Sequence, residues 1–191
     1  MVRYSRMMDL GTPAPDFSLP DAAGRLHSLK DCAGSKALLV AFLCNHCPYV
    51  QHMLDGFVKF AREYQPRGLA VFAISSNDIA AHPEDAPAKM GELARARGFT
   101  FPYLFDESQQ AALGFGAVCT PDFFLFDREL KLAYRGQFDA SRPQRADLPV
   151  TGADLRAAVD AVLAGKSAPA EQQASAGCSI KWKPENEPEW A

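Results

Sequence analysis

The chain has 191 residues, of which 48% are hydrophobic and 23% charged, a composition typical of a globular protein that folds without disulfide staples. Its 20 basic and 23 acidic residues give a net charge of −3, which argues against a nucleic-acid-binding surface. No apolar run is long enough to span a bilayer, and residues 1–15 lack the apolar core of a secretory signal. We therefore expect a cytoplasmic protein without membrane insertion, made of one domain with a terminal extension.

Strands and helices are expected to alternate along the chain. Residues 16–29 predict two short strands around a turn, and the apolar run over 36–43 is typical of a strand buried on both faces. A helix is expected from Pro48, because apolar residues recur at helical spacing as far as Tyr64. The later predicted elements are a strand over 69–75, a helix opening at 83–85 and closing at Gly98, a short strand near 103–105, a helical turn over 107–113, strands over 123–126 and 130–134, and a helix over 152–164. This succession predicts an α/β fold, with a mixed sheet flanked by helices and an N-terminal β-hairpin.

Two cysteines stand between the predicted strand over 36–43 and the following helix, in the sequence Cys44-Asn45-His46-Cys47. The unsatisfied N–H groups of a helix start favour an anionic sulfur, and a thiolate is the nucleophile of disulfide exchange. We expect Cys44 to be the low-pKa, attacking thiol and Cys47 to be the resolving thiol. His46 is expected to stabilise the Cys44 thiolate, which makes the pair a better oxidant, and oxidation is expected to join the two cysteines.

Other roles of these cysteines stay open at this level. A Cys-x-x-Cys is also half of a zinc site, which needs two further ligands from Cys119, Cys178 or a histidine. Cysteines also occur as ordinary buried residues. His46 is alternatively a merely solvated residue at the helix start, even where the cysteines are redox-active. A redox-sensing or metal-binding thiol module is therefore the non-enzymatic alternative. Because the sequence has no second Cys-x-x-Cys, we expect neither a metal nor a cofactor.

Residues 166–191 differ in composition from the rest of the chain. They are rich in Ser, Ala, Gln and Pro, yet they contain both tryptophans, Trp182 and Trp190. Large aromatic rings gain most from burial, and disordered tails are poor in them. We therefore expect a domain over residues 9–165 and a C-terminal extension that docks on it through Ile180 and Trp182.

The surroundings of the cysteine pair resemble the thioredoxin fold. In that fold a cis-proline loop faces the Cys-x-x-Cys, and Thr120-Pro121 is the matching dipeptide here. Five segments together resemble the peroxiredoxin-like group of the redoxin (AhpC/TSA-like) superfamily: FLCNHCPYV, SSNDIAAHPEDAPAKM, CTPDFFLFD, YRGQFDASRP and GCSIKWKPENEP. The resemblance implies a thiol–disulfide oxidoreductase in which Thr120 and Pro121 bind the substrate backbone. It also implies a thiol or disulfide protein as the electron donor or acceptor.

The chain departs from its relatives at informative positions. Peroxiredoxins carry a Pro-x-x-x-Thr-x-x-Cys motif whose cysteine aligns with Cys47, but Val40 and Cys44 replace the Pro and the Thr here. Thioredoxin has a buried Asp six residues before its first cysteine, where Leu38 stands in this chain. Disulfide exchange is therefore the expected reaction. The alternative enzyme is a thiol peroxidase that forms a sulfenic acid on Cys47 or Cys44.

Three further cysteines lie outside the motif. Cys119 is two residues before Pro121, so we expect it near the pair, either as a third redox thiol or as a packed residue. Three roles stay open for Cys178: a resolving thiol, a disulfide partner for Cys119, or an inert residue. Cys32 has no motif around it and is expected to be structural. The sequence leaves the substrate, the electron donor and the oligomeric state open.

Overall fold

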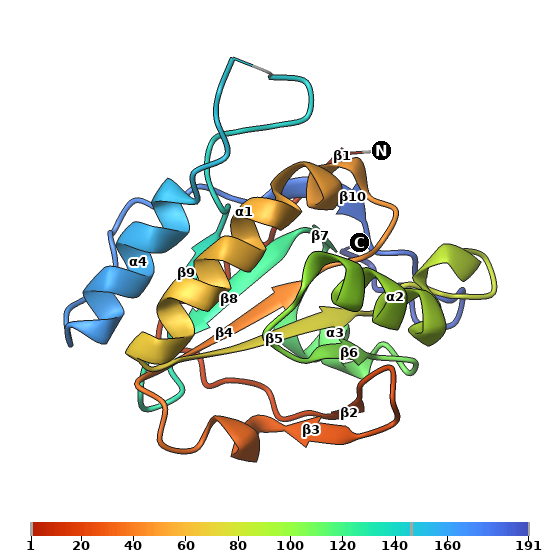
Figure 1. The fold of residues 1–191 in the computed structure, drawn as a ribbon, viewed down its shortest axis with the longest axis horizontal. Coiled ribbons are helices and arrows are strands. Elements are labelled where there is room, and N and C mark those ends of the chain that lie inside the picture. The colour runs from red at the N-terminus through yellow and green to blue at the C-terminus, as the bar shows by residue number, and fades with distance from the viewer. Residues whose placement is uncertain (1, 146, 191) are drawn as a thin grey trace.

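The computed structural model describes residues 2–145 and 147–190. Its centre is a five-stranded sheet whose strands are, in spatial order, β6 (Tyr103–Phe105), β5 (Leu69–Ser75), β4 (Ala37–Phe42), β8 (Asp122–Phe126) and β9 (Leu132–Gly136). The strands β4, β5 and β6 are parallel, whereas β8 runs antiparallel to both β4 and β9. The mixed sheet predicted from the sequence is therefore confirmed (Figure 1).

Helices and a hairpin cover the two faces of this sheet. The helices are α1 (Pro48–Tyr64), α2 (Pro87–Arg97), α3 (Gln110–Phe115) and α4 (Ala153–Leu163), with short 3₁₀ helices η1 (Leu29–Cys32) and η2 (Gln65–Arg67). Alternate side chains of a strand point to opposite faces, so β4 supplies two cores. Leu39 and Ala41 pack in one cluster with α1 and α4, which lie in front of the sheet in Figure 1. Leu38, Val40 and Phe42 pack in the other cluster, with α3 and the N-terminal segment.

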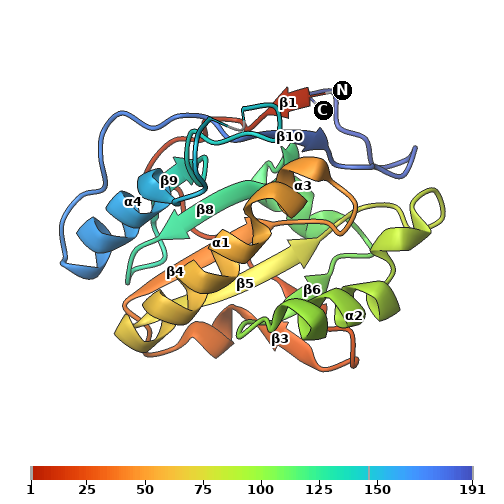
Figure 2. The same ribbon diagram turned by 45° about the horizontal axis from the view of Figure 1, so that its top comes forward.

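The N-terminal hairpin is confirmed as β2 (Ser18–Pro20) paired with β3 (Leu26–Ser28). A separate three-stranded sheet consists of β1 (Val2–Tyr4), β10 (Ala176–Ser179) and β7 (Cys119–Thr120), in that order. Figure 2 shows β1 and β10 together, next to both ends of the chain. Just after β10, Ile180 is 3% exposed in the second core cluster and Trp182 packs against it. The division into residues 9–165 and 166–191 stays a prediction.

The segment before α2 differs from the predicted helix that opens at 83–85. Pro83–Asp85 form a separate 3₁₀ helix, η3, and α2 begins only at Pro87. Ala86 is extended, with φ −62° and ψ 151°, because a residue before proline is biased away from helical conformation. This break turns the Asp85 side chain inward, where it is fully buried. The other helix expected nearby, over 107–113, lies slightly later, at α3.

None of the helices in the described residues, 2–145 and 147–190, has both the length and the apolar character needed to cross a membrane.

Candidate active site

The cysteine pair lies where β4 leaves the sheet and α1 begins. Cys44 is two residues beyond the end of β4, and Cys47 is the N-cap residue of α1, with Pro48 as the first helical residue. A proline is tolerated there because a first-turn N–H has no partner inside the helix. Both cysteines are free thiols and both are buried, with exposed fractions of 1% for Cys44 and 0% for Cys47. The sulfur atoms are therefore shielded from large partners in this state.

The cis-proline loop faces the pair, as the sequence predicted. The Thr120–Pro121 peptide bond is cis. The hydroxyl of Thr120 lies 3.2 Å from Cys44 Sγ. When Cys47 is protonated, its thiol donates to the carbonyl oxygen of Thr120 over 3.1 Å. One residue of the loop thus contacts both sulfur atoms.

The two thiols have pKa shifts of opposite sign. Hydrogen bonds lower the pKa of Cys47 to about 5; the donors are the Cys44 thiol, the Cys178 thiol and the backbone N–H groups of Val50 and Cys178. These donors outweigh both burial and the contact with the Thr120 carbonyl, which favours the protonated form. The pKa of Cys44 is raised well above its usual range, because Cys44 donates to Cys47 and is buried near the Asp85 carboxylate.

The directions of these shifts favour Cys47 over Cys44 as the low-pKa thiol, and the order of attack expected from the sequence stays a prediction. The sequence placed the start of the helix at Pro48, as the structure does, and assigned the effect of its free N–H groups to Cys44. Cys47 is the N-cap residue and therefore lies closer to the first turn of α1 than Cys44 does, and hydrogen bonding from the Val50 N–H is one of the causes that lower its pKa. The pKa shifts thus favour the second cysteine of the motif as the thiolate.

A buried carboxylate organises the other side of the pair, and the sequence analysis did not single it out. Asp85 accepts the backbone N–H of Asn45 over 2.7 Å and the side-chain amide of Asn77 over 2.8 Å. His46 Nδ1 lies 2.7 Å from the same carboxylate. The hydrogen-bonding groups of His46 are thus directed at Asp85, and its expected stabilisation of a Cys44 thiolate stays a prediction. The signal for Asp85 in the sequence is its place just before an Ala-Pro break.

With this geometry established, comparison with known proteins places the chain in a family. The sequence model of the AhpC/TSA family matches residues 10–135. This chain belongs to the AhpC/TSA family. The thiol–disulfide oxidoreductase ResA of Geobacillus thermodenitrificans is 28% identical over 123 residues, 64% of this chain and 66% of that protein. A Mycobacterium tuberculosis protein named as a peroxiredoxin is 30% identical over 107 residues, 56% of this chain and 63% of that protein. Each alignment spans just under two thirds of the relative's own length.

One solved structure matches the fold over nearly the whole chain, and another matches it over most of the chain. A hypothetical protein of Sinorhizobium meliloti is 52% identical, with a TM-score of 0.93, covering 95% of this chain and 98% of that one. The M. tuberculosis peroxidoxin BcpB is 20% identical, with a TM-score of 0.61, covering 83% of this chain and 97% of that one. At that identity the second likeness establishes the thioredoxin-like fold alone.

Two other cysteines of this AhpC/TSA chain lie at the pair. Cys119 is fully buried, and burial together with the neighbouring Asp122 carboxylate raises its pKa well above the usual range. Cys178, on β10, is partly exposed and packs against the cluster that holds the pair. Burial and its hydrogen bond to Cys47 raise the pKa of Cys178 to about 11. Both are therefore neutral thiols while the pair is reduced.

Two groups of side chains with metal-ligand chemistry occur in the described residues beside the pair. Cys44, His46 and Asp85 bring their ligand atoms within 4.8 Å of one another, and His46 forms a second such group with His82 and Glu84. The Asp85 carboxylate already accepts three hydrogen bonds, and Glu84 is 3.2 Å from His82 Nδ1. These contacts satisfy the polar groups without an ion.

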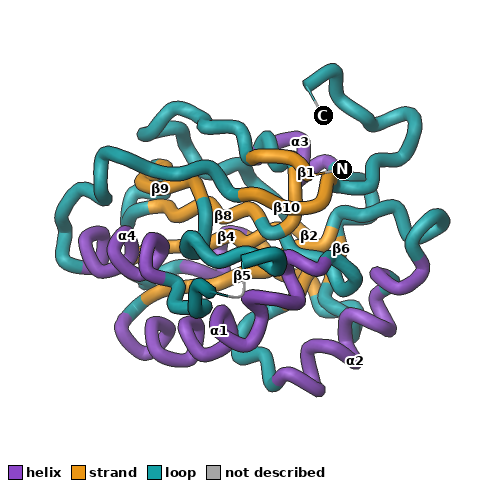
Figure 3. Tube along the Cα trace, turned by 90° about the horizontal axis from the view of Figure 1, so that it is seen from above, coloured by secondary structure: helices purple, strands orange, loops and turns teal. Residues whose placement is uncertain are grey.

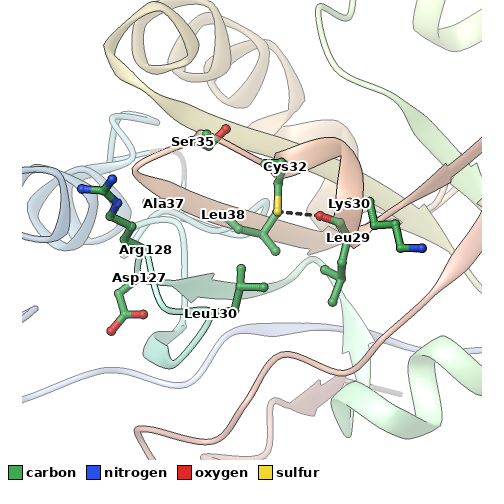
Figure 4. Close-up of a pocket in the computed structure, with 11 residues that line it drawn as sticks. Leu29, Lys30, Cys32, Ser35, Ala37, Leu38, Asp127, Arg128 and Leu130 are labelled. Atoms are coloured by element: carbon green, nitrogen blue, oxygen red, sulfur yellow. Dashed lines mark hydrogen bonds between the residues drawn. The ribbon is translucent and has the colours of Figure 1, made fainter.

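Cys32 lies away from the pair, at the opposite end of β4. It lines a pocket of about 390 Å³ together with Ala37 and Leu38 (Figure 4). Its thiol donates to the carbonyl of Leu29 over 2.8 Å. A satisfied, buried thiol of this kind agrees with a structural role, and it makes Cys32 a control for experiments on the other cysteines.

Proposed function

We propose that this protein is a thiol–disulfide oxidoreductase whose redox pair is Cys44 and Cys47. One observation carries the proposal: an N-cap cysteine with a pKa of about 5 lies beside a neutral thiol three residues earlier, and a cis-proline loop contacts both. At neutral pH such a cysteine is almost entirely thiolate, the form that attacks disulfides.

The reaction then begins with Cys47 and ends with Cys44. The Cys47 thiolate attacks a disulfide of the partner, forms a mixed disulfide and releases the partner's other sulfur as a thiolate. Cys44 then loses its proton and attacks Cys47 Sγ, which releases the partner's second thiol and leaves a Cys44–Cys47 disulfide. A thiol protein restores the reduced pair by the reverse exchange. This order reverses the one expected from the sequence, in which Cys44 attacks.

Peroxide reduction is the second candidate, and a specific contact favours it. Cys44 replaces the threonine of the peroxiredoxin motif, yet its thiol still donates a hydrogen bond to the Cys47 thiolate. In this reaction the peroxide oxidises Cys47 to a sulfenic acid and leaves as water or an alcohol. Cys44 then condenses with the sulfenic acid, which releases water and forms the disulfide. A relative named as a peroxiredoxin lends further support.

A paired assay separates the two functions. Reduction of insulin by dithiothreitol is measured beside consumption of hydrogen peroxide, for the wild type, Cys44→Ser, Cys47→Ser and the control Cys32→Ser. Exchange predicts insulin reduction that is lost in Cys44→Ser and Cys47→Ser and kept in Cys32→Ser. Peroxide consumption without insulin reduction would replace the first proposal by the second. Neither activity in the wild type would contradict both.

A further inference from the structure

The strand β10 occupies the edge of the cis-proline loop. It pairs antiparallel with β7, so that Cys178 lies opposite Thr120 and Ser179 lies opposite Cys119. On its other side β10 pairs with β1, and the two strands lie side by side in Figure 3. Extended peptides commonly bind proteins by adding a strand to such an edge. The chain's own C-terminal segment thus fills the place where a peptide would pair with Thr120.

The fit between β10 and the loop depends on a glycine. A Cβ atom at Gly177 would lie 2.0 Å from the carbonyl oxygen of Thr120 and 2.5 Å from its carbonyl carbon. Only a residue without a side chain allows this approach. Ser175 secures the strand further, since its hydroxyl donates to the Pro121 carbonyl over 2.6 Å. The strand is therefore shaped to lie against the cis-proline loop.

This placement brings a third thiol to the redox pair. Cys178 packs against the cluster that contains Cys44 and Cys47, and each of Cys47 and Cys178 shifts the pKa of the other. Of the three cysteines, Cys178 alone is partly exposed. A partner too large to reach the buried pair can therefore meet Cys178 first.

We propose that β10 is a substrate strand supplied by the chain itself, and that Cys178 carries the disulfide from the buried pair to the surface. The proposal rests on the function proposed above. In the oxidised protein the Cys178 thiolate attacks Cys47 Sγ, the Cys44–Cys47 bond breaks and a Cys47–Cys178 bond forms. The electron pair leaves on the Cys44 sulfur, which takes up the proton lost by Cys178. A thiolate of a partner protein then attacks Cys178 Sγ at the surface, which breaks the Cys47–Cys178 bond and releases Cys47 as a thiolate. A second thiolate of the partner attacks the partner's sulfur in this mixed disulfide, which releases Cys178 and leaves the disulfide on the partner.

The electrostatics of the site support this direction. In the reduced protein the Cys47 sulfur is anionic, and its hydrogen bond and charge are two of the causes that raise the pKa of Cys178 to about 11, after burial. When Cys47 is in a disulfide, its sulfur is neutral and both effects disappear. The nearby Lys181 ammonium, which lowers the pKa of Cys178, remains. Oxidation of the pair thus makes Cys178 a better nucleophile.

Disulfide mapping of Cys44→Ser tests the proposal, because this variant removes the other thiol of the pair and leaves Cys47 free to react with Cys178. The full chain is treated with one equivalent of diamide, alkylated and mapped by mass spectrometry. We expect an intramolecular Cys47–Cys178 disulfide, with two thiols lost and a monomer on a non-reducing gel. If Cys178 is still alkylated while Cys47 carries an adduct or an intermolecular bond, the proposal is overturned. A second measurement equilibrates the wild type with glutathione buffers and maps its disulfides. We expect both the Cys44–Cys47 and the Cys47–Cys178 disulfide, in exchange with each other.

A glycine substitution tests the role of the strand separately. Adding Gly177→Ala to Cys44→Ser should displace β10 and lower the yield of the Cys47–Cys178 disulfide several-fold. The matched control is Gly114→Ala, whose Cβ meets Pro15 at 3.3 Å, well away from the thiols. If Cys44→Ser/Gly177→Ala gives as much Cys47–Cys178 disulfide as Cys44→Ser alone, the proposal that β10 holds Cys178 beside the pair is contradicted.

The two proposals fail in different ways. If the function proposed above is wrong, neither the wild type nor Cys178→Ser forms a Cys44–Cys47 disulfide, and neither reduces insulin. If only the role of Cys178 is wrong, the wild type forms that disulfide and reduces insulin, and Cys178→Ser turns over at the wild-type rate. This comparison uses a thiol protein as the reductant, because dithiothreitol is small enough to reach the buried pair directly. With that reductant, a several-fold lower turnover in Cys178→Ser, with a normal Cys44–Cys47 disulfide, supports the relay.

Discussion

The two flanks of the redox pair are built from different chemistry. On the side of β5 and α2, the buried carboxylate of Asp85 binds Asn45 and His46, so a negative charge lies next to Cys44. On the side of β7 and β10, neutral donors meet Cys47, among them the thiol and the backbone N–H of Cys178. A negative charge disfavours a thiolate and hydrogen-bond donors favour it. The hydrogen bond between the two cysteines is the largest cause of their opposite pKa shifts, and the neighbours on the two flanks act in the same directions.

The largest expected effects come from replacing Cys47 alone, or Cys44 and Cys178 together. Cys47→Ser should reduce insulin turnover to background, because the thiolate of the pair is lost. The double variant Cys44→Ser/Cys178→Ser should instead trap a mixed disulfide between Cys47 and the partner, which mass spectrometry detects. A mixed disulfide trapped on Cys44 of Cys47→Ser would restore the order expected from the sequence.

The pH dependence of alkylation measures the difference between the thiols directly. The pKa of Cys47 is lowered to about 5, so its thiolate is present above that pH and is lost as the pH falls through it. The rate of Cys47 alkylation by iodoacetamide should therefore be flat from neutral pH upward and fall about tenfold per unit in acid. The rate at Cys178, whose pKa is about 11, should still be rising at pH 9. If the alkylation rates of Cys47 and Cys178 depended on pH in the same way, the difference in pKa between these two thiols would be contradicted.

Asp85→Asn removes the charge from the first flank. We expect the pKa of Cys44 to fall, since the Asp85 carboxylate is one cause of its rise. Because an amide cannot accept from all three donors, unfolding in urea should also show a loss of about 1–3 kcal/mol. Asp106→Asn is the matched control: this buried carboxylate accepts from Ser76 and from the Ala112 N–H, away from the thiols. If Asp106→Asn also lowered the pKa of Cys44, the shift in Asp85→Asn could not be assigned to the charge of Asp85.

The smallest expected effect belongs to His46. Its Nδ1 is engaged with Asp85, so His46→Ala should lower the reduction potential of the pair by less than about 30 mV, equivalent to about 1.4 kcal/mol. Equilibration with glutathione buffers measures this shift, with His82→Ala, which removes the ring stacked on His46, for comparison. A larger fall would mean that the imidazole acts on the thiolate directly, as the sequence analysis expected.

Local patterns in the sequence predicted much of the architecture. The apolar run over 36–43 became β4, buried on both faces, and the helical spacing after Pro48 became α1. The Thr120-Pro121 dipeptide proved to be the cis-proline loop. These features depend on neighbours in the chain or on a pattern shared with the thioredoxin fold, so a single sequence is sufficient to find them.

The sequence by itself thus determined the fold class, the position of the cysteine pair and the loop that faces it. The largest cause of both pKa shifts is the hydrogen bond between Cys44 and Cys47 themselves, and only the tertiary structure adds the effects of Asp85, Thr120 and Cys178, which lie 38 or more positions away in the chain. The same holds for β10, which contains no long apolar pattern and is a strand because β7 and β1 offer it partners. Electrostatic and strand-pairing energies act through space, and periodicity along the chain does not record them.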